Sequence, residues 1–329
     1  MLSELARFSM RFPLPWMFAG GAALALVLGA CRGDDASRTS QLGEERSFIE
    51  HWVQRGEYRI RVREYAGDEP AIVLMHGFPD NMHLYDRLVP HLAGRRLVLF
   101  DFLGWGDSDK PEGYPYTFAN LEGDLDAVVE GLGLDRVVLV GHDASGPPAI
   151  NWALAHPEQV AALVLLNTFY SPSETINPPE AIRIFSNDAF DRLAQAIVDS
   201  PEISRWLFFW QVGQFFRDAE VRDEFVPLFY ETFEATPSAR PAFLRLNEDL
   251  GAAVLANAAN NERLAAFPQP VRIIFGEDDP YLNADYARYL DELFGDSELL
   301  LVKNARHYVQ IDEPAEVARL ILETPLAGR

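Results

Sequence analysis

The sequence predicts an α/β fold, in which helices cover both faces of a mostly parallel sheet. Short apolar runs with the length of buried strands alternate with helical patterns along most of the chain. In one long interval this alternation stops, which predicts an inserted helical domain. The chain has 329 residues and 48% of them are apolar, so one large domain with a sizeable core fits its length.

The predicted strands and helices follow one another at regular intervals. Residues 57–65 alternate in polarity and predict an edge strand. Buried strands are predicted at 71–75, 97–100, 136–140, 163–166, 271–275 and 299–302. Helices are predicted at 121–132, 149–155, 284–294 and 315–322. In a sheet of this kind, functional residues lie at the carboxyl ends of the strands.

Residues 169–266 interrupt the alternation. This interval has helical patterns and many aromatic residues, with WLFFW at 206–210 and FF at 215–216. We interpret it as a helical lid inserted into a core that comprises residues 47–168 and 267–329. Some of these aromatic residues must pack the lid itself, and others are expected to line an apolar substrate pocket.

The first 31 residues have the pattern of an export signal. Arg7 and Arg11 precede an uncharged stretch at 12–31, whose most apolar part has the length of a signal-peptide core. The stretch ends in Leu-Gly-Ala-Cys, and Cys31 is the only cysteine of the chain. This ending resembles a bacterial lipobox, which implies a signal peptide at 1–31 and lipidation of Cys31. An uncleaved membrane anchor is the alternative.

Both interpretations predict an exported protein that its N-terminus holds at a membrane of the bacterial cell envelope. Residues 32–46 are polar and predict a flexible tether to the folded domain. The formal net charge is −22, and a surface this acidic repels phosphate backbones. Nucleic acid is therefore not an expected partner.

The motif with the clearest chemistry is VVLVGHDASG at 137–146. A buried strand runs into a sharp turn and then a helix, with the small residues Gly141 and Ser145 two positions on either side of Asp143. This arrangement resembles the nucleophile elbow of α/β-hydrolases, whose central residue is usually serine. A carboxylate there can attack a saturated carbon and form an ester, whereas helix capping is the alternative role. An esterase that uses Ser145 is a different reading, but Ser145 would lie on the helix.

Two further residues follow in the chain order of the α/β-hydrolases. Asp279 lies in GEDDP after the strand at 271–275, and His307 follows the last predicted strand by a short loop. An acid at that position orients the histidine and stabilises its imidazolium form. The spacing favours Asp279, although its neighbours Asp278 and Glu277 remain alternatives.

The motif HGFPD at 76–80 directly follows a predicted strand. In α/β-hydrolases, the N–H after His-Gly and the N–H after the nucleophile form an oxyanion hole. The resemblance implies that the backbone N–H groups of Phe78 and Ala144 take this role. His76 and His142 are predicted to be structural.

The loop DFLGWGDSDKP at 101–111, with HGFP and GHD, resembles the epoxide hydrolase and haloalkane dehalogenase branch of this superfamily. We interpret the loop as structural and not as a phosphate cradle. The resemblance implies hydrolysis of a small apolar substrate by water, through an ester on Asp143, with no metal or organic cofactor. Haloalkane dehalogenases typically have Trp after the nucleophile and often Asn after His-Gly, and fluoroacetate dehalogenases have Arg after the nucleophile. This chain has Ala144 and Phe78 there.

Epoxide hydrolysis is our first expectation, and dehalogenation of haloalkanes is the second. Epoxide hydrolases use two lid tyrosines to protonate the epoxide oxygen, and this lid contains Tyr170 and Tyr230. A leaving halide needs N–H donors, for which Asn167 and Trp105 are candidates. A lipid-anchored binding module without activity is a further alternative, but such a module does not need a complete triad.

Overall fold

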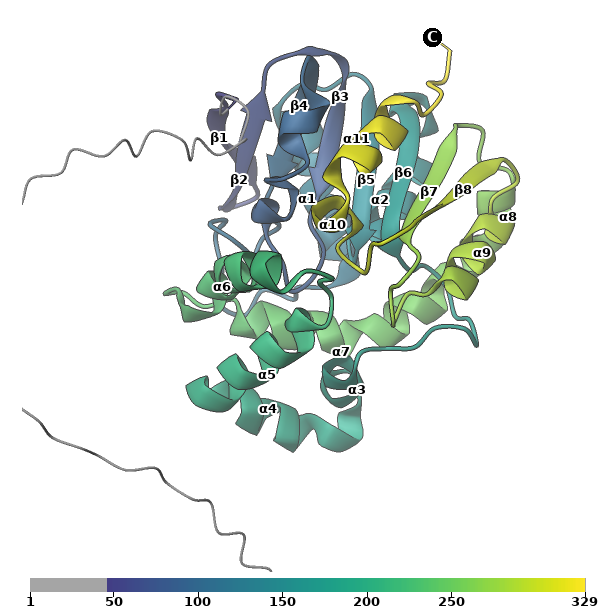
Figure 1. The fold of residues 1–329 in the computed structure, drawn as a ribbon. Coiled ribbons are helices and arrows are strands. Elements are labelled where there is room, and N and C mark those ends of the chain that lie inside the picture. The colour runs from purple at the N-terminus through teal and green to yellow at the C-terminus, as the bar shows by residue number, and fades with distance from the viewer. Residues whose placement is uncertain (1–45, 329) are drawn as a thin grey trace, which may run out of the picture. The chain divides into compact units, whose positions relative to one another are not determined.

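The computed structural model describes residues 46–328. They contain an eight-stranded sheet with the strand order β1-β2-β4-β3-β5-β6-β7-β8 (Figure 1). The strands are β1 (Ile49–Arg55), β2 (Tyr58–Tyr65), β3 (Asp68–Met75), β4 (Arg95–Phe100), β5 (Val137–Asp143), β6 (Val160–Thr168), β7 (Val271–Gly276) and β8 (Ser297–Val302). β1 pairs antiparallel with β2, and β2 pairs antiparallel with β4. The six strands from β3 to β8 all pair in parallel. The predicted signal peptide, Cys31 and the tether up to residue 45 lie outside the described residues.

The edge of the sheet differs from the prediction. The stretch at 57–65 forms β2, and β1 pairs with it on the outer side from Ile49 opposite Glu64 to Arg55 opposite Tyr58. β1 buries only Val53 completely, so its sequence lacks the apolar signal of an inner strand. Arg46, at the end of the predicted tether, already contacts the domain, because its guanidinium donates to the carbonyl oxygen of Leu92 at 3.3 Å.

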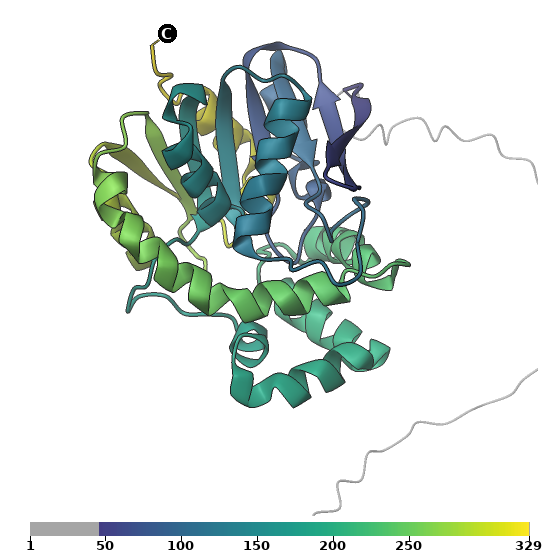
Figure 2. The same cartoon turned by 180° about the vertical axis from the view of Figure 1, so that it is seen from behind.

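Helices cover both faces of the sheet, which confirms the predicted α/β class. α1 (Phe118–Gly131) and α2 (Gly146–Ala155) lie on one face, and α10 (Val309–Asp312) and α11 (Pro314–Leu322) lie on the other (Figures 1 and 2). α9 (Ala284–Leu293) lies beside β7 and β8. β6 is buried along its whole length, which explains its continuous apolar sequence.

The segment between β6 and β7 is helical, and most of it lies beyond the carboxyl ends of the strands (Figures 1 and 2). Its helices are α3 (Glu180–Phe185), α4 (Asp191–Asp199), α5 (Pro201–Gly213), α6 (Ala219–Glu234), α7 (Arg240–Asn257) and α8 (Asn261–Ala265). α7 runs along the carboxyl edge of the sheet, between the strands and α3 to α5 (Figure 1). No helix in the described part of the chain has both the length and the apolar character needed to cross a membrane.

Candidate active site

Asp143 lies at the end of β5 in a strained turn. Its φ is +49°, a conformation that side-chain-bearing residues rarely adopt. The turn depends on Gly146, because a Cβ atom there would lie 1.8 Å from Oγ1 of Thr168. A Cβ on Gly141 would lie 3.1 Å from the Cα of Gly146. Local packing thus requires glycine at 146 and leaves little room for a side chain at 141, and the turn presents the Asp143 side chain beyond the sheet edge.

Ser145 has a structural position in this turn. Its buried Oγ lies 2.9 Å from the carbonyl oxygen of Met75 and 2.8 Å from that of His142, and it accepts the N–H of His142 at 2.8 Å. These bonds tie the turn to β3, and Ser145 is not part of the cavity lining. The arrangement gives no support to an esterase based on Ser145.

Two carboxylates flank His307. Its Nδ1 atom lies 2.8 Å from Oδ2 of Asp279, and its Nε2 atom lies 3.6 Å from Oδ2 of Asp143. Asp279 is buried, whereas its neighbours Glu277 and Asp278 are exposed. Of these three acids, Asp279 is therefore the one that the fold brings to His307.

The Asp279 carboxylate accepts four hydrogen bonds. Oδ2 accepts from Nδ1 of His307 and from Nδ2 of Asn167, both at 2.8 Å. Oδ1 accepts the backbone N–H groups of Tyr281 at 2.8 Å and Leu282 at 3.2 Å. This set of donors satisfies a carboxylate that has no access to water and fixes its direction toward His307.

The position of Asn167 corrects our expectation that it reaches the pocket. Its side chain is buried between Asp279 and the backbone N–H of Gly276, which donates to Oδ1 of Asn167 at 2.8 Å. Both ends of the amide are occupied in this way. Asn167 is therefore a positioning residue for the acid and not a donor to a leaving group.

The charges around His307 favour its protonated form. Burial lowers the pKa of His307, but the charge and hydrogen bond of Asp279, with smaller effects of Asp143 and Asp80, raise it to about 9. Burial raises the pKa of Asp143, while the charge of His307 and two backbone N–H groups oppose this shift. The pKa of His307 therefore favours an imidazolium that faces Asp143 at neutral pH.

Both predicted oxyanion donors lie against the Asp143 carboxylate. The N–H of Phe78 donates to its Oδ1 atom at 3.2 Å, and the N–H of Ala144 also contributes a hydrogen bond. The structure thus brings together the five residues that the motifs indicate, namely Asp143, His307, Asp279, Phe78 and Ala144.

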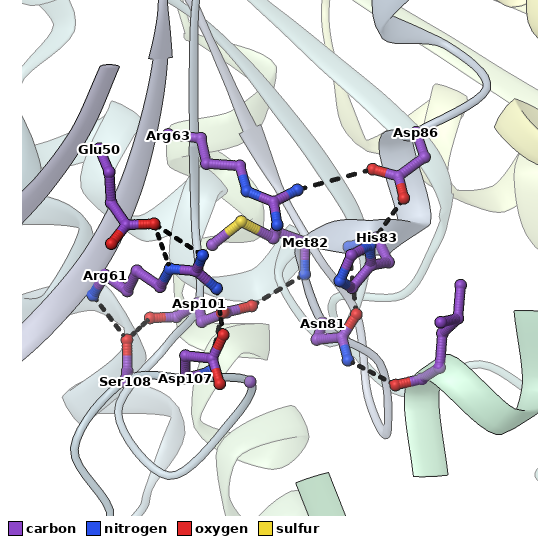
Figure 3. A network of polar contacts seen from close by, with 12 residues as sticks. Glu50, Arg61, Arg63, Asn81, Met82, His83, Asp86, Asp101, Asp107 and Ser108 are labelled. Atoms are coloured by element: carbon purple, nitrogen blue, oxygen red, sulfur yellow. Dashed lines mark hydrogen bonds and ion pairs between the residues drawn. The ribbon is translucent and has the colours of Figure 1, made fainter. Parts of the chain in front are cut away.

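A polar network holds the loop that carries Phe78 (Figure 3). Asp101 accepts the N–H of Met82 at 2.8 Å and, on its other oxygen, the N–H of Asp107 at 3.0 Å. Ser108 donates to the carbonyl oxygen of Asp101 at 2.6 Å. A Cβ on Gly106 would lie 2.0 Å from the carboxyl group of Asp101, so the loop at 101–111 can close only with glycine there. The loop at 101–111 therefore has a structural role, as the sequence suggests, because it holds the segment that follows Phe78.

The same network reaches the lid. The side-chain amide of Asn81 donates to the carbonyl oxygen of Leu228 in α6 at 3.0 Å (Figure 3). His76 is also structural, because its Nε2 accepts the N–H of Phe102 at 3.1 Å and its Nδ1 lies 2.7 Å from the carbonyl oxygen of Gly77. These contacts fix the oxyanion loop from both sides.

Behind the nucleophile lie two buried polar atoms without a partner among the described residues. They are Oδ2 of Asp80 and Nδ1 of His142, which are 3.9 Å apart. The other oxygen of Asp80 accepts the hydroxyl of Tyr308 at 2.6 Å, and Nε2 of His142 lies 3.0 Å from the carbonyl oxygen of His307. Burial, opposed by the Tyr308 hydrogen bond, raises the pKa of Asp80 to about 7. At 3.9 Å the two atoms do not form a hydrogen bond, but a neutral Asp80 carboxyl group directs its proton toward His142 and avoids a second buried charge beside Asp143.

A cavity of about 430 Å³ lies between the carboxyl edge of the sheet and the lid. Asp143, Ala144 and His307 form its base, and the surrounding walls are mainly apolar. Its remaining polar lining residues are Ser173, Asn177, Ser186, Ser204, Gln211 and Tyr281. In the described chain, the lining contains no Lys or Arg.

The cavity lining corrects three further expectations, because it contains neither Tyr170, Tyr230 nor Trp105. The hydroxyl of Tyr170 donates to Asn151 at 2.7 Å. Tyr230 stacks on Phe233 and lies beside the guanidinium of Arg205. These tyrosines therefore do not form the pair that an epoxide oxygen would need.

Trp105 packs its ring edge-on against Phe78, with the ring centroids 5.6 Å apart. The tyrosine that does line the cavity is Tyr281, which the sequence analysis missed. The sequence feature that could have indicated Tyr281 is its position two residues after Asp279, in a loop at the carboxyl end of a strand. In residues 46–328, no group of three or more His, Cys, Asp or Glu side chains is arranged to hold a metal ion.

Comparison with known proteins identifies similar chains. Residues 70–314 match the family model described as the alpha/beta hydrolase fold. Haloalkane dehalogenase 2 of Mycobacterium tuberculosis is 28% identical over 284 residues, which are 84% of this chain and 94% of that protein. Bifunctional epoxide hydrolase 2 of Sus scrofa is 27% identical over 295 residues, covering 78% of this chain and 51% of that protein.

A solved structure with a similar fold is that of the epoxide hydrolase CorEH without ligand. Its TM-score is 0.71 and its identity 21%, and the match covers 84% of this chain and 98% of that one. The similarity between this structure and CorEH shows that the two chains share a fold.

Proposed function

Because the chain belongs to the α/β-hydrolase fold family, in its epoxide hydrolase and dehalogenase-like branch, we propose that it hydrolyses a small organic substrate through an ester on Asp143. One observation carries this proposal. The Asp143 carboxylate lies at the base of an apolar cavity, with His307 on one side and the N–H of Phe78 on the other. The substrate class that we propose is an epoxide.

In the first half-reaction, Asp143 attacks a ring carbon of the epoxide. Oδ1 is held by the N–H of Phe78, so Oδ2 is the attacking oxygen. The new bond joins Oδ2 to the carbon, the ring C–O bond breaks, and its electron pair goes to the epoxide oxygen. The His307 imidazolium gives this oxygen a proton, since its pKa is about 9. The products are a hydroxyalkyl ester and a neutral His307.

In the second half-reaction, His307 takes a proton from water, and the hydroxide adds to the Cγ atom of Asp143. Negative charge develops on Oδ1, where the N–H groups of Phe78 and Ala144 stabilise it. The Cγ–Oδ2 bond then breaks, and the alkoxide takes the proton from His307. The acid that remains on Asp143 returns its proton to His307, so the starting protonation state is restored.

This proton balance favours an epoxide over a halide. An epoxide oxygen stays on the product and needs a proton, which a resting imidazolium supplies. A halide departs as an ion and needs N–H donors around it, but the side chains of Ala144 and Phe78 offer none. A carbon–halogen substrate is the second candidate, because the Mycobacterium tuberculosis relative is named a haloalkane dehalogenase.

The variant His307→Gln tests the covalent step. The variant lacks both the proton donor of the first half-reaction and the base of the second, so Asp143 attacks more slowly than in wild type and the ester is not hydrolysed. After mixing with a terminal epoxide, we expect peptide mass spectrometry to find an ester on Asp143 and turnover to be lost. An adduct on Ser145, or near-normal turnover of Asp143→Ala, would overturn the proposal.

We also propose, from the sequence pattern alone, that the protein is exported and lipidated on Cys31 after cleavage of residues 1–30. Intact mass and membrane fractionation of wild type and Cys31→Ser test this. The variant should lose the lipid mass and leave the membrane fraction. If the N-terminus is not cleaved and Cys31→Ser stays in the membrane fraction as wild type does, the N-terminus is instead a plain membrane anchor.

A further inference from the structure

One wall of the cavity is formed by α5, which presents Ser204, Phe208 and Gln211 at helical spacing. The ring of Phe215, just after the helix, lies 4.7 Å from the ring of His307 and 5.6 Å from the ring of Tyr281. Gln211 precedes Phe215 by four residues, lines the same cavity and is hydrogen-bonded to the hydroxyl of Tyr281. The amide of Gln211 therefore lines the cavity beyond the reacting groups.

Gln211 and Tyr281 form a buried hydrogen-bonded pair on this wall. Nε2 of Gln211 donates to the hydroxyl oxygen of Tyr281 at 2.9 Å, and the hydroxyl donates to Oε2 of Glu180 at 3.0 Å. Oε1 of Gln211 accepts the N–H of Ala181 at 2.9 Å. These bonds orient both side chains, so the pair does not have to be ordered when a ligand binds.

The Gln211–Tyr281 pair has hydrogen-bonding capacity that its own contacts do not use. The amide of Gln211 has two N–H groups, and Tyr281 takes only one of them. The hydroxyl oxygen of Tyr281 has two lone pairs, and Gln211 occupies one. No other hydrogen bond in residues 46–328 takes the second N–H or the second lone pair, and the Glu180 carboxylate, which also interacts with the amide of Gln211, is the one group that competes for this N–H. The pair thus provides one donor and one acceptor beside the cavity.

We propose that Gln211 and Tyr281 bind a hydroxyl group of the substrate, several bonds away from the carbon that Asp143 attacks. A hydroxyl group can accept from the amide of Gln211 and donate to the oxygen of Tyr281, so it matches both free positions. This inference deepens the proposed function and rests on it for the identity of the reacting group.

The charge near this pair disfavours an anionic substrate. Glu180 lies directly behind Tyr281, and hydrogen bonding to its own backbone N–H lowers its pKa, so it is ionised. The part of the chain that lines the cavity contributes no Lys or Arg that could offset this charge. A carboxylate on the substrate would therefore meet repulsion and find no counter-ion, and we infer that the substrate is neutral.

The test compares matched terminal epoxides with the purified full-length protein. The compounds have the same chain length and end in a methyl, hydroxymethyl or carboxylate group, and the hydroxyl is moved along the chain to find its best position. The readout is the ratio of kcat/KM for the hydroxyl and methyl compounds. In wild type the hydroxyl compound should be preferred and the carboxylate disfavoured. Tyr281→Phe and Gln211→Met should each reduce the preference about threefold to tenfold, as expected for one lost hydrogen bond.

Tyr289→Phe is the matched control, because its hydroxyl donates to the carbonyl oxygen of Pro172 and the residue is not part of the cavity lining. It should keep the wild-type ratio. The same ratio in wild type, Tyr281→Phe and Gln211→Met would overturn the inference. A carboxylate compound that reacts faster than the methyl compound would overturn the claim of a neutral substrate. Two independent variants keep the test decisive if one of them fails to fold.

The inference and the proposed function can fail separately. If wild type converts none of these epoxides to a diol, the proposed function fails. In that case, calorimetric titration with an unreactive alkanol and an alkanoate of equal length still tests the site. Tyr281→Phe and Gln211→Met should weaken alkanol binding relative to wild type, and the alkanoate should bind less tightly than the alkanol. Equal alkanol affinity in all three proteins would overturn the inference.

Discussion

Nδ2 of Asn167 donates to Oδ2 of Asp279 at 2.8 Å, on the same oxygen that accepts Nδ1 of His307. The two residues are 112 positions apart in the sequence, yet both are buried at the end of adjacent strands. The amide orients the acid, and the acid in turn orients the base. Asn167 therefore affects turnover without touching the substrate.

Replacing this amide should slow the reaction. In Asn167→Ala, the buried Asp279 carboxylate loses one of four donors, which costs about 1.5–3 kcal/mol for a hydrogen bond to a charged group. We expect kcat to fall about tenfold to a hundredfold with little change in KM, and steady-state diol formation measures it. Asn260→Ala is the control, since its amide contacts Tyr170, Asn151 and Arg263, which all lie outside the cavity lining. Equal kcat in wild type and Asn167→Ala would contradict this role.

The pH dependence of the first half-reaction should depend on the leaving group. His307 must be an imidazolium to protonate an epoxide oxygen, and its pKa is about 9 in the free protein. The value of kcat/KM for an epoxide should therefore fall as the pH rises through about 9. A haloalkane needs no proton in this step, so its kcat/KM should not show that fall. An epoxide profile that stays level to pH 10 would contradict the acid role of His307.

Asp80 should make folding stability depend on pH. Its pKa is raised from 3.8 to about 7 in the folded protein, so the unfolded chain loses this proton first as the pH rises. Its contribution to stability is complete below pH 3.8 and is lost progressively up to about pH 7, at a slope of about 1.4 kcal/mol per pH unit. Asp80→Asn has no such titration, and its amide can donate to His142 while its carbonyl oxygen accepts from Tyr308.

Denaturant unfolding between pH 4 and pH 8 measures this effect. The stability of Asp80→Asn relative to wild type should increase over that range. Asp80→Ala is the comparison, because it leaves Nδ1 of His142 and the hydroxyl of Tyr308 without partners and should destabilise at every pH. A constant difference between Asp80→Asn and wild type would show that Asp80 is ionised in the folded protein.

The sequence predicted those parts of the site that depend on local patterns. Asp143 and the loop with Phe78 each follow a buried strand directly, and His307 follows the last strand by a short loop, so strand periodicity together with the resemblance to α/β-hydrolase motifs located them. The branch of the superfamily also followed from these motifs. β1 was missed because an exposed edge strand has little apolar signal.

The contacts between distant segments could not be predicted in this way. Asn167 and Tyr281 both lie next to strand ends, but which side chain turns toward the cavity depends on local backbone conformation. Asn167 has a φ of +28°, and its side chain turns toward β7 and Asp279. Tyr230 was selected as a tyrosine of the lid, and only the packing of α5 and α6 determines that it faces Arg205 and not the cavity.

The most direct test of the covalent mechanism is a single turnover in water labelled with ¹⁸O. With enzyme in excess over an epoxide, the oxygen added to the substrate comes from Oδ2 of Asp143, and the water oxygen enters the carboxylate. We predict a diol without ¹⁸O and a peptide containing Asp143 that is heavier by one ¹⁸O atom, both measured by mass spectrometry. A labelled diol together with an unlabelled Asp143 peptide would mean that water attacks the substrate directly, which would contradict the account.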